Sequence, residues 1–149
     1  MRFVALLPSL LILAASVAGA AEKPSAAKGE QLYKRPGLCI TCHQATGAGL
    51  PGAFPPLAGS DWIYESPEIL TKIVLHGVQG PITVNNKKYA TAMPGQGAQL
   101  KDQEVADILT YVRSAWGNTG DPVTADVVAK VRAENATRKT MWTVKELKP

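Results

Sequence analysis

The sequence predicts an all-α fold in a single domain whose helices are joined by long ordered loops. Apolar residues recur at the three- and four-residue spacing of a helix face in four separate stretches of the 149-residue chain. No stretch of useful length alternates apolar and polar residues as a half-buried strand would. Glycine and proline are concentrated between the helical stretches, where they disfavour regular structure.

The beginning of the chain is predicted to be a removable secretory signal. Arg2 supplies a positive start, residues 4–17 form a largely apolar run, and residues 18–20 match a small-residue cleavage site. The alternative is a membrane anchor, but the run is shorter than the roughly 20 apolar residues of a spanning helix, and no basic stop follows it. We therefore expect cleavage.

The remaining chain is long enough for one compact domain and too short for two. We expect a signal peptide at residues 1–20, a domain at 21–120 and a C-terminal extension at 121–149. After removal of the signal, no stretch has the length and apolarity to cross a membrane, so a soluble monomer is expected. The net charge of +4 comes from dispersed basic residues, whereas a nucleic-acid binder would concentrate them with aromatic residues in one patch.

Two short helices separated by a loop are expected in the first half of the domain. The first covers residues 26–33 and starts after Ser25, a plausible N-cap. Residues 47–59 hold four glycines and three prolines, which predicts a loop. The second helix covers residues 67–76, because a serine cap and a proline precede its apolar positions and Gly77 stops it.

The strongest helical pattern lies in the last third of the chain, where apolar residues at i, i+3, i+4, i+7 and i+11 predict a helix over residues 100–116. Those residues are Val105, Ile108, Leu109, Val112 and Trp116. Residues 80–97 are expected to be a loop with a tight turn at Asn85 and Asn86. The extension has a further stripe of four valines, which predicts a short helix followed by an irregular tail containing Trp142.

The extension also needs somewhere to bury its apolar residues. Packing back on its own domain is the favoured interpretation, because an exposed apolar patch is a liability in a soluble monomer. The alternative is that Trp142 docks into a partner.

The long loops present a difficulty for so small a domain. Loops of this length are uncommon unless they serve a function, and three or four short helices bury little apolar surface by themselves. A large apolar prosthetic group would resolve both problems, since loops and helices could pack on it.

Both cysteines of the chain lie in one short motif, in which Cys39, Cys42 and His43 have the spacing C-x-x-C-H. This spacing is the attachment pattern of a c-type haem. Two thiols three residues apart on one helical turn project to the same side, where each can add to one vinyl group of haem. The imidazole of the following residue then lies under the ring and can bind iron. The sequence therefore predicts one covalently bound haem c, and secretion fits because such attachment occurs outside the cytoplasm in bacteria.

The motif has three alternative interpretations. Cys39 and Cys42 could form a disulfide or a thiol-exchange centre, but both interpretations leave His43 unexplained. The second also expects a βαβ pattern, which is missing from the sequence. A zinc site could use both cysteines with His43 and His76. The adjacent Cys42 and His43 would have difficulty reaching the same tetrahedral ion.

Haem iron offers a second axial position, for which Met93 is the predicted ligand. It lies in a loop just before the last predicted helix of the domain, where its thioether can reach the far face of the ring. Core packing is the usual role of a lone methionine, but Met93 is not on a helical stripe. His76 is the remaining competitor, and its place at a helix end favours a hydrogen bond or capping.

The motif, the Met-Pro loop and the terminal amphipathic helix together resemble the class I cytochromes c over residues 26–117. The resemblance implies a cytochrome c fold, with three core helices wrapped with long loops around one covalently bound haem. In that family a glycine and an aromatic residue of the first helix cross an aliphatic and an aromatic residue of the last. The matching residues are Gly29, Tyr33, Ile108 and Tyr111.

The resemblance also implies how the haem is enclosed. Residues 55–59 look like the segment that covers the proximal side, so the carbonyl of Pro55 would accept the Nδ1 hydrogen of His43, and Leu57 would pack on the ring. Trp62 would reach a haem propionate. Within the family, the chain resembles single-haem cytochromes found beside periplasmic dehydrogenases or fused to nitrite reductases. This second resemblance rests on Gly77, Gly80, Met93, Pro94 and residues 111–114.

With iron held by His43 and Met93, no coordination site stays open for a substrate, so a one-electron carrier is expected and not an enzyme. Its expected compartment is the periplasm, with a dehydrogenase as donor and an oxidase or reductase as acceptor. One alternative is a haem enzyme such as a peroxidase, in which Met93 is absent from iron or leaves it easily. Another is a fixed cytochrome subunit of a dehydrogenase complex.

Overall fold

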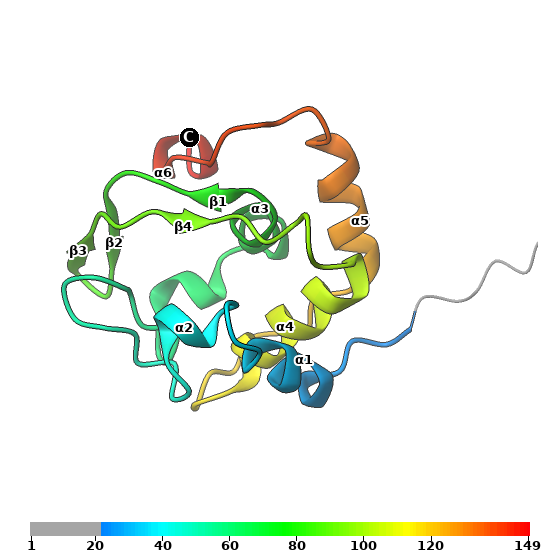
Figure 1. Cartoon of the computed structure of the whole chain (residues 1–149), viewed down its shortest axis with the longest axis horizontal. Helices are drawn as coiled ribbons and strands as arrows, with labels where there is room; N and C mark the ends of the chain where they lie inside the picture. The colour runs from blue at the N-terminus through cyan, green and yellow to red at the C-terminus, as the bar shows by residue number, and fades with distance from the viewer. Residues whose placement is uncertain (1–21) are drawn as a thin grey trace, which may run out of the picture.

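The computed structural model describes residues 22–149, so the predicted signal peptide lies outside the described residues. Within them, helices dominate and the strands are two or three residues long (Figure 1). The elements in order are α1 (Ala26–Tyr33), α2 (Ile40–His43), the 3₁₀ helix η1 (Asp61–Tyr64), α3 (Pro67–His76), β1 (Gly77–Val78), β2 (Ile82–Val84), β3 (Lys87–Tyr89), β4 (Met93–Pro94), α4 (Asp102–Ser114), α5 (Ala125–Glu134) and α6 (Val144–Leu147).

The predicted helices are present, and two have the predicted bounds. In α1 and α3 the N-cap serines accept backbone hydrogen bonds from the first turn, which fixes both starts. Helix α4 is shorter than the predicted 100–116. The carboxylate of Glu104 accepts the amide of Lys101 at 2.8 Å and begins the helix there. Extended backbone at Ala115 and a positive φ of 54° at Trp116 end it.

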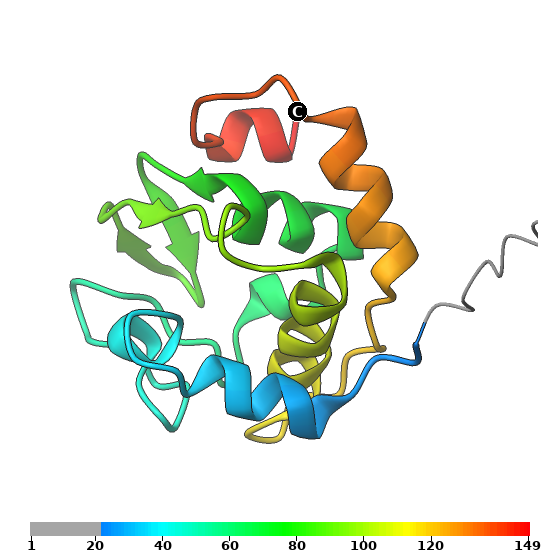
Figure 2. The same cartoon turned by 45° about the vertical axis from the view of Figure 1, so that its right-hand side comes forward.

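Helices α1 and α4 cross at very short range (Figure 2). Gly29 is buried in this crossing, and a Cβ atom there would overlap the main-chain carbonyl of Asp107. Beside it the rings of Tyr33, Tyr111 and Trp116 pack with centroids 5.2 to 5.5 Å apart. The crossing implied by the family resemblance is thus confirmed, and it joins the two ends of the core domain.

Two antiparallel two-stranded sheets were not predicted. Strands β1 and β4 pair with Val78 opposite Met93, and β2 and β3 form a hairpin. Such short pairings leave no alternation to find in the sequence. The tight turn predicted at Asn85 and Asn86 is confirmed, because both have positive φ, at 48° and 61°, as the favoured two-residue hairpin turn requires.

The C-terminal extension packs back on the domain, as expected. Helix α5 contacts α3 and α4, and Val128 and Val131 are fully buried there. The tail predicted as irregular contains α6, which lies near β1 in Figure 1. Trp142 is buried, with 8% of its surface exposed, and pairs with Val78 in a parallel bridge. No helix in residues 22–149 is both long and apolar enough to cross a membrane.

Candidate haem site

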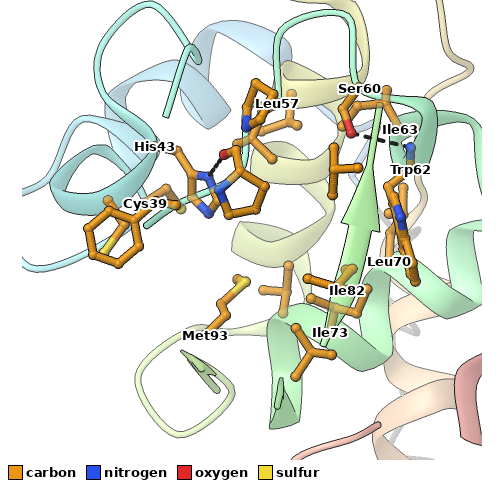
Figure 3. A pocket seen from close by; sticks show the side chains of 18 of the residues that line it. Cys39, His43, Leu57, Ser60, Trp62, Ile63, Leu70, Ile73, Ile82 and Met93 are labelled. Carbon is orange, nitrogen blue, oxygen red and sulfur yellow. Dashed lines mark hydrogen bonds between the residues drawn. The ribbon is translucent and has the colours of Figure 1, made fainter. Parts of the chain in front are cut away.

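A large apolar cavity opens between α2, α3, α4 and the two sheets (Figure 3). It encloses about 1050 Å³ of space outside the protein atoms, its open mouth included. The lining includes Cys39, Cys42, His43, Leu57, Trp62 and Met93, so every predicted site residue lies on this one cavity.

His43 is held in the orientation that a metal ligand needs. It closes α2 and is buried, with 7% of its surface exposed. Its Nδ1 atom is 3.0 Å from the carbonyl oxygen of Pro55, and since a carbonyl only accepts, Nδ1 carries the hydrogen (Figure 3). Burial lowers the pKa of His43, although the bond to Pro55 opposes this, so the ring is neutral near pH 7. Its Nε2 lone pair is therefore available to a metal.

The two cysteines lie on one turn at the cavity. The amide of His43 donates to the carbonyl of Cys39 at 2.9 Å, which closes the turn. Cys39 and Cys42 are not joined in a disulfide. Burial raises the pKa of the Cys39 thiol to about 11, so this thiol is protonated at neutral pH. A thiol-exchange centre requires the opposite, a thiolate stabilised by a lowered pKa.

Met93 and His76, the two competitors for the second axial position, are separated by the fold. Met93 lies on β4 and lines the cavity, with its sulfur directed inward from the wall opposite His43 in Figure 3. His76 does not line this cavity; its ring is edge-on to that of Trp142, with centroids 6.3 Å apart. The hydrogen bond expected of His76 is not found at Nε2, which has no partner among the described residues.

The zinc interpretation finds no support in residues 22–149, where no three His, Cys, Asp or Glu side chains are grouped as a metal site. A haem iron needs only two axial ligands from the protein, because the porphyrin supplies the other four. The donor set therefore suits haem better than a free ion.

Leu57 and Trp62 line the cavity, and one detail of their predicted roles changes. The indole nitrogen of Trp62 donates to the carbonyl of Thr83 at 2.8 Å. This hydrogen is thus not free for a propionate, and Trp62 contributes its ring to the wall. On the outer side, the ammonium group of Lys148 lies 4.1 Å from the centroid of the same ring and pairs with Glu65.

The sequence did not predict two polar residues that support the walls of the cavity, Asn118 and Arg113. The side-chain amide of Asn118 donates to the carbonyls of Leu57 and Val112, at 3.0 and 2.8 Å, and accepts the amide of Gly59 at 2.9 Å. Buried Arg113 donates to the carbonyls of Ile63, Glu65 and Asp121 at 2.6 to 3.0 Å. No local motif signals these roles; the one available signal is that Arg113 follows the apolar Leu109 by one helical turn and is therefore placed to be buried.

The residues present fit a c-type haem. Two thiols on one turn can form the thioethers, a neutral imidazole has a free nitrogen, and a thioether sulfur faces it across an apolar space. The fold and site thus define a protein that encloses one covalently bound haem.

The cytochrome c family model matches residues 26–116, and the chain belongs to this family. Membership implies covalently bound haem c, typically one per domain. Cytochrome c-552 of Thermus thermophilus is 40% identical over 125 residues, which cover 74% of this chain and 88% of that protein.

Cytochrome subunits of dehydrogenases are also similar. The cytochrome c subunit of a quinone-type alcohol dehydrogenase from Gluconacetobacter polyoxogenes is 38% identical over 100 residues, 66% of this chain and 21% of that protein. The gluconate 2-dehydrogenase cytochrome c subunit of Pantoea cypripedii is 35% identical over 104 residues, 64% and 22% respectively. The chain therefore spans about a fifth of these subunits and most of cytochrome c-552.

Proposed function

We propose that the protein is a one-electron carrier in which His43 and Met93 are the axial ligands of the haem c iron. The observation that carries this proposal is the placement of the two side chains on opposite walls of one apolar cavity, beside both cysteines. With both axial positions filled, the iron has no open site at which a substrate could react. Its role is then electron transfer without transformation of a small molecule.

The bound haem supplies a metal centre that changes its charge by one electron. The chain sets the reduction potential of the iron and limits the structural rearrangement that accompanies the gain or loss of the electron. The bond from His43 to Pro55 fixes the imidazole and raises its basicity as a ligand. The thioether of Met93 favours the reduced state relative to a second histidine, which raises the potential. The apolar walls keep water away from the iron, so few dipoles need to reorient.

The proposed compartment is the periplasm, reached through the predicted signal at residues 1–20. The proposed donor is a periplasmic dehydrogenase and the proposed acceptor an oxidase or reductase. The similarity to cytochrome subunits of dehydrogenases supports the donor class and also favours a second candidate, a fixed subunit of such a complex. Copurification with a dehydrogenase from the native source would distinguish the fixed subunit from the free carrier.

Substitution of Met93 tests the ligation. In Met93→Ala the weak ferric absorption of the iron–sulfur bond should disappear, and the potential should fall by on the order of 0.1 V, a fraction of the roughly 0.8 V that axial ligands span. His76→Ala is the matched control and should leave both unchanged. An unchanged spectrum in Met93→Ala would assign Met93 to packing. Resting high-spin ferric iron in the wild type would favour a haem enzyme such as a peroxidase.

Covalent attachment is tested separately. Haem should stay with the denatured polypeptide through acid-acetone extraction, because Cys39 and Cys42 both form thioethers. Replacing either cysteine alone should leave a single linkage and a lower yield of mature protein. Complete extraction of haem from the wild type would contradict the attachment.

A further inference from the structure

The strand that carries Met93 is supported by the C-terminal extension. Strand β1 lies between β4 on one edge and Trp142 on the other, so Val78 is flanked by Met93 and by Trp142. The amide of Trp142 donates to the carbonyl of Gly77 at 3.0 Å, and its carbonyl accepts the amide of Gln79 at 2.8 Å. The extension thus adds one bridged residue to the free edge of this two-stranded sheet, whose other strand carries the proposed ligand.

Trp142 is itself firmly held. Its ring belongs to an apolar cluster that includes Val78 and, at its margin, Met93. The guanidinium carbon of Arg138 lies over the ring, 3.4 Å from its centroid. Arg138 also donates to the carbonyl of Met141 and to the carboxylate of Glu146, both at 2.9 Å. The residue that borders β1 on its free edge is therefore held by several contacts of its own.

A second contact holds the chain just after Met93. From α5, Arg132 donates to the carbonyls of Gly97 and Leu100 at 2.7 and 2.8 Å. Its Nε atom is 2.6 Å from a carboxylate oxygen of Asp102 at the start of α4. The segment between β4 and α4 is thus bound to the extension by one side chain, independently of Trp142.

We propose that the C-terminal extension is a positioning element for Met93, and that Trp142 and Arg132 are its two positioning residues. The inference rests on the proposed ligation by Met93. A strand of two residues has little stability of its own, so its neighbours decide how often it moves away from the iron. By holding β4 through β1 and the following segment through Arg132, the extension keeps the sixth position closed.

Imidazole, which binds ferric iron only when the thioether has left, measures this opening. Its apparent affinity is the intrinsic affinity scaled by the open fraction. In the ferric holoprotein, the Trp142→Ala and Arg132→Gln variants should each bind imidazole about tenfold more tightly than the wild type. Binding is measured as the loss of the iron–sulfur absorption. Lys130→Gln is the matched control, because Lys130 lies on the same helix, is 67% exposed and only approaches Glu134 at 4.0 Å. Trp142→Phe should restore most of the wild-type affinity.

A further variant separates positioning from general loosening. Val105→Ala opens a gap in the core at a fully buried residue that does not line the haem cavity. At a similar loss of stability in urea, it should bind imidazole no more tightly than the wild type. Equal tightening in Val105→Ala would overturn the proposal, as would wild-type affinity in the Arg132 and Trp142 variants.

The failure of the ligation gives a different result. If the wild-type ferric protein lacks the iron–sulfur absorption, Met93 is not the ligand and both proposals fail together. If the absorption is present and responds to Met93→Ala but imidazole affinity is unchanged in the extension variants, only the positioning role is wrong. Arg132→Gln leaves Trp142 in place, so the imidazole measurement still tests the positioning role if Trp142→Ala does not yield haem-loaded protein.

Discussion

Replacing Asn118 by alanine should destabilise the holoprotein by about 3 kcal/mol. Its side chain makes three hydrogen bonds and only 5% of its surface is exposed. Each such bond contributes roughly 0.5 to 1.5 kcal/mol net, so three bonds near the middle of this range give about 3 kcal/mol. The loss measures how strongly Asn118 holds residues 57–59, which cover the His43 side of the cavity, against the end of α4.

Urea unfolding of the oxidised holoprotein, followed by far-ultraviolet circular dichroism, gives the free energy. Asn135→Ala is the matched control, because Asn135 makes one side-chain hydrogen bond, to the carbonyl of Val131 at 2.7 Å, at the end of α5. Asn135→Ala should lower the free energy of unfolding by about 1 kcal/mol or less. Asn118→Asp keeps the acceptor for Gly59 but turns a carboxylate toward two carbonyls, so it should cost at least as much as alanine. If Asn118→Ala costs no more than Asn135→Ala, the three-bond account is wrong.

Three further outcomes are expected. Gly29→Ala should lower the free energy of unfolding by about 2 kcal/mol, because overpacking at the α1–α4 crossing costs more than the roughly 1 kcal/mol gained in helix propensity. Ala27→Gly, at an exposed position of the same helix, should show the propensity effect alone, and a stabilised Gly29→Ala would exclude the close crossing. Burial and nearby arginine charges lower the pKa of His76, so the folded state binds fewer protons than the unfolded state and stability should fall as the pH drops below 6.5. His76→Phe should remove that fall between pH 7 and 5, and an unchanged pH profile in this variant would refute the role of His76. Exposed Lys87 and Lys88 flank the Met93 loop, so the rate of electron transfer to an acidic partner should decrease with salt, and less steeply when both are glutamine.

Local signals in the sequence were sufficient for the helices and for the haem attachment motif. The caps of α1 and α3 are set by residues within one turn, so their bounds were predicted correctly. The tight turn of the β2–β3 hairpin was likewise predicted from two adjacent asparagines. Each of these features depends on neighbours in the chain, which a single sequence displays.

Features that depend on distant partners could not be predicted. Strand β1 exists because Gly77 and Val78 meet β4 and Trp142, and neither partner changes the local pattern. Asn118 bonds residues about sixty positions away, so it has no local signature. The indole nitrogen of Trp62 was expected to reach a propionate, but in the folded chain it donates to the carbonyl of Thr83, a partner with no local signal in the sequence.

The crossing of α1 and α4 also has a consequence for how fast the chain folds. The amide of Ser25 donates to the carboxylate of Asp107 at 2.7 Å across 82 residues of sequence, and most residues that line the haem cavity lie between them in the chain. This closure must be made before its contacts are gained, so folding should be slower than in a helical protein with local contacts. Because closure entropy grows only with the logarithm of loop length, flexible residues inserted at the exposed hairpin turn should slow refolding only slightly.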